Sequence, residues 1–184
     1  MFFCICKIAR FSFVILGIMT KLIIIRGNSG SGKSSVASAV QEQTTPYPML
    51  IEHDYVRRKV LKEKESQDAI NAELLYRMTE YGLENGRDVI IEGILRLDKY
   101  RSLFERLIKI HPESNYFYYF DIPFEETLAR HNTKDNTDFG EEEMRRWYKE
   151  DDETGYGNEI IIPKDNSLDK TVNQIIEQTG LIRG

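Results

Sequence analysis

The sequence predicts a single α/β domain, built on a five-stranded parallel sheet with helices on both faces. The chain has 184 residues, the length of one domain rather than two. Short apolar runs alternate with amphipathic stretches, which is the pattern of successive βαβ units. The first such run, Leu22 to Ile25, contains no polar residue, as expected of a strand that helices cover on both faces.

The bounds of the strands and helices follow from this alternation and from the capping residues, glycines and prolines between the elements. The predicted strands are 22–25, 49–53, 89–91, 116–120 and 159–162, and the predicted helices are 33–43, 66–85, 98–111, 123–130, 141–148 and 167–178. Ser66 and Asp98 are predicted N-caps of the second and third helices. In the second helix, one stripe is predicted to face the core, formed by Ile70, Leu74, Met78 and Tyr81.

Composition excludes several classes of protein. A hydrophobic fraction of 41% excludes a disordered chain, and a charged fraction of 30% excludes a multi-span membrane protein. The net charge of −5 argues against non-specific nucleic-acid binding. The only cysteines, Cys4 and Cys6, form neither a disulfide framework nor a zinc site and fit a reducing cytoplasm. We expect a cytoplasmic monomer or homodimer without a membrane partner.

The first nineteen residues differ in composition from the rest. Lys7 and Arg10 precede an apolar run, as in a secretory signal, but no small-residue cleavage site follows. Nine apolar residues are also too few to span a bilayer. The interpretations that remain are a peripheral extension, a weak membrane anchor or a start codon placed too far upstream, since Met19 directly precedes the first strand. The predicted domain is 20–184.

Residues 27–34 carry the strongest motif of the chain. They match G-x-x-x-x-G-K-[ST] at each defined position, between a predicted strand and a predicted helix, in the order Gly27, Asn28, Ser29, Gly30, Ser31, Gly32, Lys33, Ser34. Glycines allow successive backbone N–H groups to face a phosphate, and the helix N-terminus adds partial positive charge. We therefore predict that this loop, with Ser35, binds a nucleoside triphosphate. Lys33 is expected to reach the β- and γ-phosphates, and Ser34 to ligate Mg²⁺.

A second set of polar residues follows the second strand. Asp54 lies where ligands bind in open α/β sheets, and Arg57 and Arg58 come three and four positions later. A carboxylate beside the γ-phosphate can accept the proton of an attacking hydroxyl, and an arginine can hold an anionic group. The alternative is that Asp54 caps a helix.

A third set follows the third strand. Glu92 is predicted to bind Mg²⁺ or a substrate hydroxyl, Gly93 to admit a ligand, and Arg96 to reach the same cleft. The alternative is an exposed salt bridge at the strand end.

The polar interval 131–157 is predicted to be a lid that closes on ATP. Arg130 ends the helix before it, and Arg145 and Arg146 lie in a short helix whose acidic residues come first, which suits the helix dipole. We predict that one of these arginines meets the transferring phosphoryl group. The alternative for each is a solvated helix surface.

The chain after residue 20 resembles the nucleoside-monophosphate-kinase-like branch of P-loop kinases, and more narrowly the zeta-toxin, chloramphenicol-phosphotransferase and polynucleotide-kinase group. Asp54-x-x-Arg57 is similar to the acceptor-activating Asp and substrate-binding Arg of that group, and Glu92-Gly-x-x-Arg96 to the zeta-toxin motif that contacts a sugar nucleotide. The resemblance implies a three-layer P-loop NTPase fold with a helical lid.

These observations predict a kinase that uses ATP and Mg²⁺ and phosphorylates a hydroxyl of a small-molecule acceptor. Within the same group, the alternative is a kinase of nucleotide or polynucleotide 5′-hydroxyls. An alternative of another class is a regulatory switch that hydrolyses its nucleotide. A switch needs guanine-reading and water-positioning motifs, and the nearest matches, 132–135 and 152–155, occur in reversed order.

Overall fold

The computed structural model describes residues 19–63, 68–133, 139–156 and 158–184. The N-terminal extension (1–18) and the predicted cap Ser66 therefore lie outside the described residues, as does part of the predicted lid (134–138 and 157). Among the described residues, no helix is long and apolar enough to cross a membrane.

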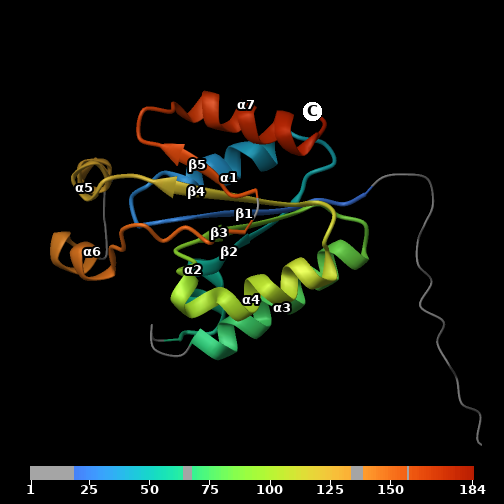
Figure 1. Cartoon of the computed structure of the whole chain (residues 1–184), viewed down its shortest axis with the longest axis horizontal. Helices are drawn as coiled ribbons and strands as arrows, with labels where there is room; N and C mark the ends of the chain where they lie inside the picture. Colours follow the sequence, from blue (N-terminus) through green and yellow to red (C-terminus); the bar gives the residue numbers. More distant parts are fainter. Residues whose placement is uncertain (1–18, 64–67, 134–138, 157) are drawn as a thin grey trace, which may run out of the picture.

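The predicted five-stranded parallel sheet is confirmed. Its strands are β1 (Leu22–Gly27), β2 (Met49–Glu52), β3 (Val89–Gly93), β4 (Asn115–Asp121) and β5 (Ile160–Pro163), all within a few residues of their predicted bounds. The strand order is β2-β3-β1-β4-β5, and each neighbouring pair is parallel. All five strands therefore end at the same edge of the sheet, which Figure 1 shows on the left.

Helices cover both faces of the sheet, as predicted (Figure 1). One face carries α1 (Lys33–Glu42) and α7 (Leu168–Thr179), and the other carries α3 (Asp68–Glu84) and α4 (Leu97–Ile110). The short elements α2 (His53–Tyr55) and η1 (Val56–Val60, a π-helical turn) lead from β2 toward α3, while α5 (Phe124–Asn132) and α6 (Glu141–Trp147) lie beyond the carboxyl edge.

Successive side chains of β1 pack alternately into two separate hydrophobic cores, one on each face of the sheet. Leu22 and Ile24 pack in the cluster beneath α3 and α4, whereas Ile23 and Ile25 pack in the cluster beneath α1 and α7. All four side chains are fully buried. A strand covered on both faces has no solvent-facing side, so it needs an apolar residue at each position.

The predicted core stripe of α3 is wrong in part. Ile70 and Tyr81 are 60% and 65% exposed, and the fully buried line of the helix is Asn71, Leu75 and Thr79. Two polar residues lie on that line because each has a partner: Asn71 Nδ2 donates to Glu63 Oε2, and Thr79 Oγ1 donates to the Leu75 carbonyl. Leu74 and Met78 do pack against the core, partly buried, so the predicted stripe lies beside the fully buried line.

The predicted cap Asp98 also needs correction. Helix α4 begins one residue earlier, at Leu97, and the side chain of its cap residue, Arg96, makes no capping hydrogen bond. The Asp152 carboxylate accepts from the Leu97 N–H, the first of the helix. The Asp98 carboxylate instead accepts from Arg96, at 3.1 Å from Nε and 2.5 Å from Nη2. A carboxylate in the first turn still stabilises the helix through its dipole.

A fully buried arginine ties the end of β1 to the chain before β5. Arg26 is 1% exposed, and its Nη1 lies 2.8 Å from Asp152 Oδ2 while its Nε lies 2.9 Å from Glu159 Oε1. Its Nη1 also donates to the Leu95 carbonyl at 3.0 Å, and the guanidinium lies 4.8 Å from the centre of the Tyr119 ring. Both carboxylates are themselves buried.

Arg26→Met is expected to lower the free energy of unfolding by about 3–5 kcal/mol, because it leaves two buried carboxylates without their cation. Urea unfolding measures the change, and Arg101→Met, on the exposed surface of α4, is the matched control. A loss below about 1 kcal/mol would show that the carboxylates are solvated or protonated without Arg26.

Candidate active site

The loop from β1 to α1 has the geometry of a phosphate cradle. Gly30 has φ +77°, and a Cβ there would lie 2.4 Å from the Thr127 carbonyl oxygen. Gly32 has φ +97° and is the N-cap of α1, so the helix N-terminus opens directly onto the loop. A side chain at either glycine would be strained, which explains why the motif requires a glycine at position 32 and why this chain has another at position 30. The predicted strand–loop–helix context of residues 27–34 is therefore present.

Lys33 and Ser34 begin α1, at the middle of the sheet edge. The Lys33 side chain is buried and its Nζ donates to the Asn28 carbonyl at 3.3 Å, so it lies folded over the loop. Strand β1 leads to a helix on one face of the sheet, and its neighbour β3 to a helix on the other. A ligand crevice forms where neighbouring strands diverge in this way.

Glu92 faces this crevice from β3. The residue is 4% exposed, and Ser34 Oγ donates to its Oε2 at 3.1 Å. Burial raises the pKa of Glu92, and Glu52 and Asp54 add to the rise, while Lys33 and Ser34 oppose it. The predicted alternative, an exposed salt bridge, is wrong. A hydroxyl and a buried carboxylate are hard oxygen donors that fit Mg²⁺, which in nucleotide sites takes few protein ligands beside phosphate and water.

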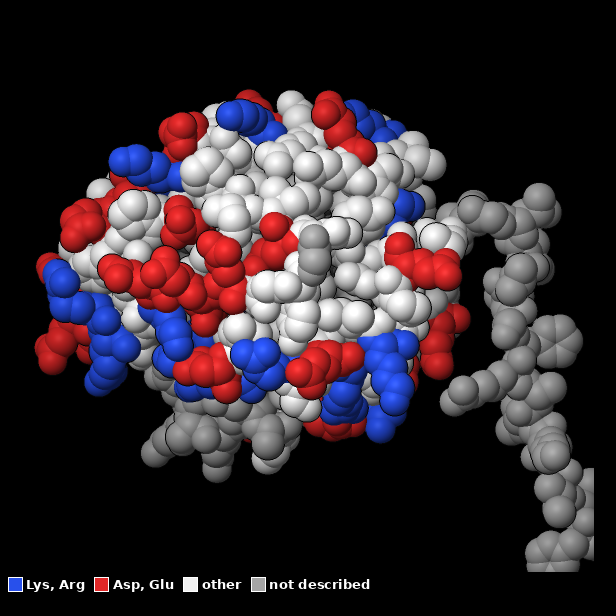
Figure 2. Space-filling model, viewed as in Figure 1, with Lys and Arg blue, Asp and Glu red and all other residues white. Residues whose placement is uncertain are grey.

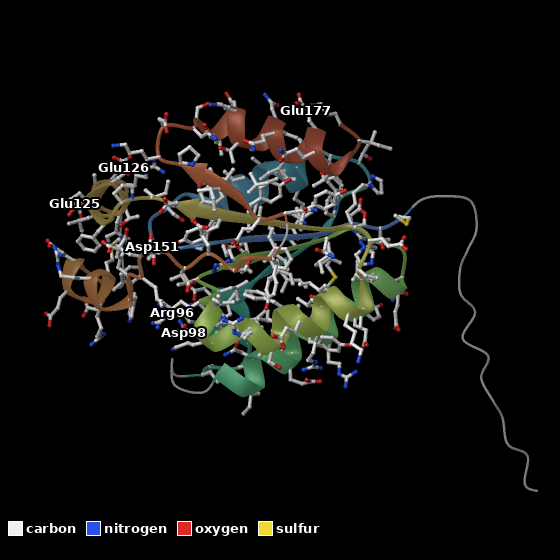
Figure 3. The ribbon with its side chains drawn as sticks, in the orientation of Figure 1. Arg96, Asp98, Glu125, Glu126, Asp151 and Glu177 are labelled. Carbon is white, nitrogen blue, oxygen red and sulfur yellow. The ribbon has the colours of Figure 1, made fainter. Side chains whose placement is uncertain are left out.

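Glu92→Gln is expected to raise the melting temperature of the nucleotide-free protein at neutral pH. Because the folded pKa exceeds the unfolded value of about 4.3, ionised Glu92 costs stability once the pH rises above that value. The melting temperature should rise by about 2–4 °C for each 1 kcal/mol of added stability, and this rise should vanish in acid. Thermal unfolding at pH 4 and 7.5 measures it, with exposed Glu177→Gln on α7 as the control (Figure 3).

The same variant should gain less stability than the wild type from added Mg²⁺–ATP, because a metal held by Glu92 favours its ionised form. Equal stabilisation of both proteins would remove Glu92 from the metal site.

Asp54 lies in α2, next to the nucleotide crevice. Helix α2 begins at His53, so Asp54 is inside the first turn and the predicted alternative of an N-cap is wrong. Its Oδ1 lies 3.2 Å from Arg57 Nη2 and 3.9 Å from His53 Nδ1. Burial would raise the pKa of Asp54, but the charges of His53, Lys33, Arg58 and Arg57 outweigh it and lower the pKa below its ordinary value. Asp54 is therefore ionised at neutral pH.

His53 is part of a hydrogen-bonded chain that sequence reasoning missed. Its Nε2 lies 2.7 Å from the Tyr100 hydroxyl, which donates to Asn71 Oδ1 at 3.0 Å. Because that hydroxyl has one proton, it accepts from His53 Nε2–H, and Nδ1 then faces Asp54. Gly93 was predicted to admit a ligand, but a Cβ there would lie 2.5 Å from His53 Cβ. The glycine thus makes room for His53.

A cavity opens beside Asp54. Its walls come from α2, η1, the start of α4 and the end of α6, and they consist of His53, Asp54, Arg57, Arg58, Ile94, Arg96, Lys99, Tyr100 and Trp147. Figure 3 shows Arg96 beside Asp98, near the beginning of α4. The structure therefore brings the predicted substrate residues of 54–58 together with Arg96. Lys99 and Tyr100 could have been found from sequence, since ligands bind at the carboxyl ends of the strands and these residues lie in the first turn of the helix that follows β3.

The three predicted lid arginines occupy different environments. Arg130 lies against the phosphate loop, where its Nη1 donates to the Ser31 carbonyl at 3.0 Å and its Nη2 to the Lys164 carbonyl at 2.8 Å. Arg145 is exposed, pairs with Glu141 at 2.8 Å and lies over the Phe124 ring. Arg146 is exposed and lies 6.0 Å from the centre of the Trp147 ring. Among the described residues that line the cavity, neither Arg145 nor Arg146 is found.

Contacts on both sides of α6 hold Trp147 at the cavity. Phe139 lies 5.0 Å from the Trp147 ring and stacks on His131 of α5 at 4.7 Å. After α6, the Asn28 side chain of the phosphate loop donates to the Lys149 carbonyl at 2.8 Å and accepts from the Lys149 N–H at 3.0 Å. Among described residues, no group of three His, Cys, Asp or Glu side chains is placed to hold a metal.

A Walker-type loop between β1 and α1, on a parallel sheet of this strand order, defines a P-loop domain of the kinase type. The AAA domain family matches residues 22–150, and the chain belongs to this family of kinase-like P-loop proteins. The predicted P-loop kinase family is confirmed, and the fold is consistent with its nucleoside-monophosphate-kinase-like branch.

Solved kinases share the fold over nearly their whole length. A sugar kinase from Janibacter sp. is 15% identical with a TM-score of 0.67, covering 86% of this chain and 93% of that chain. A gluconokinase from Sinorhizobium meliloti is 15% identical with a TM-score of 0.64, covering 89% of this chain and 94% of that chain. The APS kinase of Mycobacterium tuberculosis, in complex with AMPPNP and APS, is 20% identical with a TM-score of 0.61, covering 88% of this chain and 98% of that chain. No curated protein matches the chain by sequence.

Proposed function

We propose that the protein is an ATP- and Mg²⁺-dependent kinase that transfers the γ-phosphate to a hydroxyl of a small-molecule acceptor. The observation that carries the proposal is the position of Asp54. Its ionised carboxylate lines a cavity and lies near enough to Lys33 of the phosphate loop for their charges to interact. A carboxylate between a phosphate loop and an enclosed acceptor is suited to accept a hydroxyl proton.

The reaction follows from these positions. The loop 27–35 holds the triphosphate, and Lys33 stabilises the charge on its transferring group. Mg²⁺ between Ser34 and Glu92 would neutralise phosphate charge. The acceptor oxygen forms a bond to the γ-phosphorus as the bond to the β,γ-bridging oxygen breaks. Asp54 takes the hydroxyl proton and ADP leaves. Arg130, Arg145 and Arg146 stay candidates for binding the phosphates, with Arg130 already against the loop.

The structural neighbours support acceptors of small size. Their titles name a sugar kinase, a gluconokinase and an APS kinase, each a protein of the same fold and similar length. By analogy with these neighbours, the cavity beside Asp54 would receive a small hydroxyl compound.

ATP turnover with and without pooled metabolites tests the proposal. A kinase is expected to hydrolyse ATP slowly alone and much faster with its acceptor, with the phosphate recovered on the acceptor. Rapid hydrolysis that no metabolite stimulates would instead support a nucleotide-hydrolysing switch. Stimulation by 5′-hydroxyl oligonucleotides alone would support a polynucleotide kinase.

A further inference from the structure

The segment 149–152, which follows α6, is held at both ends against the carboxyl edge of the sheet. At its first residue, the Asn28 side chain of the phosphate loop binds the Lys149 backbone through two hydrogen bonds, of 2.8 and 3.0 Å. At its last residue, the Asp152 carboxylate accepts from Arg26 at the end of β1 and from the Leu97 N–H at the start of α4. The segment therefore joins the phosphate loop to the beginning of α4.

The backbone between these two attachments is strained. Asp151 has φ +48°, in the left-handed region that residues with a side chain seldom adopt. Figure 3 shows Asp151 at the same edge of the sheet as Arg96 and Asp98. Strain of this kind persists only where the surrounding structure holds the chain in place, and it is common at functional sites. The contacts of the segment thus fix the position of Lys149 relative to the phosphate loop.

The Lys149 side chain extends from the phosphate loop toward α4. Its Nζ lies 3.7 Å from Asp98 Oδ2, whereas its backbone is bound to Asn28. The Asp98 carboxylate is already bound by Arg96, at 2.5 Å from Nη2. An ion pair as long as that of Lys149 and as open to solvent is weak. Because lysine carries its charge on a flexible four-carbon chain, Nζ can leave Asp98 without any movement of the backbone.

A small recess lies between the phosphate loop and the cavity beside Asp54. Residues 27–28 of the loop line one side of the recess, and Ile94 and Arg96 are also among its lining residues. Ile94 and Arg96 line the cavity beside Asp54 as well. Lys149, bound at one end to the loop and at the other beside the start of α4, therefore lies where a phosphoryl group would pass from nucleotide to acceptor.

Lys149 is the one cation in an acidic stretch of the sequence. The four residues after it are Glu, Asp, Asp and Glu, and positions 150–158 contain no Lys or Arg. Acidic side chains also lie close together in the left half of the face in view in Figure 2, toward the carboxyl edge of the sheet. Negative charge repels a triphosphate. A cation at the one position that the phosphate loop binds directly would offset this repulsion.

We infer that Lys149 supplies a positive charge that stabilises the phosphoryl group during its transfer. Its Nζ would turn from Asp98 toward the γ-phosphate, and it exchanges no proton in the reaction. Arg145 and Arg146, which were predicted for this role, are absent from the described residues that line the cavity. This inference rests on the proposed kinase function and adds a further catalytic residue to it.

Lys149→Gln is expected to lower kcat for acceptor-dependent turnover by about 10²-fold or more, the effect of removing one preorganised group from a transition state. Affinity for Mg²⁺ with AMP-PNP should change far less, because loop 27–35 holds the phosphates of the ground state. Both hydrogen bonds from Asn28 go to the backbone of residue 149, so the melting temperature should also hold. Lys149→Arg should recover part of kcat, and exposed Lys170→Gln on α7 is the control.

Asp98→Asn tests whether Lys149 acts only through its ion pair. This variant weakens the pair with Lys149 but leaves the lysine in place. It is expected to lower kcat far less than Lys149→Gln does. Equal losses of kcat in the two variants would show that the pair merely positions the chain, and would overturn the inference. A larger loss in Arg145→Gln or Arg146→Gln than in Lys149→Gln would overturn it as well.

Binding of MgADP with aluminium fluoride, which mimics the transferring phosphoryl group, distinguishes this inference from the function beneath it. The wild type is expected to bind MgADP more tightly when fluoroaluminate is added, and Lys149→Gln to lose most of that gain. Wild-type kcat in Lys149→Gln, or an undiminished gain, overturns the inference and leaves the kinase function standing. A gain that depends on Lys149, in a protein that no hydroxyl compound stimulates, would support Lys149 at the phosphoryl group and count against the kinase function.

Discussion

Asp54→Asn is expected to lower acceptor-dependent turnover by about 10²–10⁴-fold, the usual contribution of a general base. Asparagine keeps the shape of the side chain but cannot take the hydroxyl proton. ATP affinity should change little, because loop 27–35 supplies the phosphate contacts. Initial rates, ATP titration and melting temperature, measured on the same preparation, separate these effects.

The wild-type pH profile gives a second test of Asp54. Because the pKa of Asp54 lies below its ordinary value, the base form persists through the neutral range and is lost only in acid below about pH 4. Asp169→Asn, in the first turn of α7, is the control for loss of a carboxylate. An Asp54→Asn enzyme with wild-type turnover would exclude the general-base role. Recovery of its activity at high Mg²⁺ would move Asp54 to the metal site and favour Glu92 as the base.

Lys33→Ala is expected to reduce phosphoryl transfer by at least about 10²–10³-fold, the effect of removing one preorganised donor from a transition state. The fold should persist, because Nζ makes its hydrogen bond to the loop itself, at the Asn28 carbonyl. Turnover and circular dichroism, compared with exposed Lys170→Ala on α7, measure the two properties. A folded Lys33→Ala protein with wild-type turnover would refute the assignment of the loop.

Most of the fold could be predicted because its signals are local. Apolar runs mark the strands, and the loop 27–34 identifies the fold by itself. The ion pairs of Arg26 could not be predicted, since its partners Asp152 and Glu159 lie 126 and 133 positions away. The buried face of α3 was predicted only in part, because Asn71 and Thr79 are buried and satisfy their polar groups there, while Ile70 and Tyr81 are exposed.

The site was predicted only in part, because some of its residues directly follow a strand in the sequence and others are placed by contacts that the sequence does not show. Strand ends pointed to Asp54, Glu92 and Arg96, and the structure places all three at the carboxyl edge of the sheet. Trp147 could not be assigned to the cavity, because its position depends on an edge-to-face contact with Phe139, which itself stacks on His131. Gly93 was linked to a ligand because sequence alone cannot show that its neighbour is His53.

The paired hydrogen bonds between Asn28 and Lys149 have a consequence for how the two substrates affect each other. They join the nucleotide loop to the chain that immediately follows Trp147, a wall of the cavity. We therefore expect a shift of the loop on ATP binding to reach the proposed acceptor site, which would link the two binding equilibria. By reciprocity, the factor by which ATP strengthens acceptor binding equals the factor by which the acceptor strengthens ATP binding. The enzyme is thus expected to bind its substrates cooperatively, with the Asn28 amide as the mechanical connection between them.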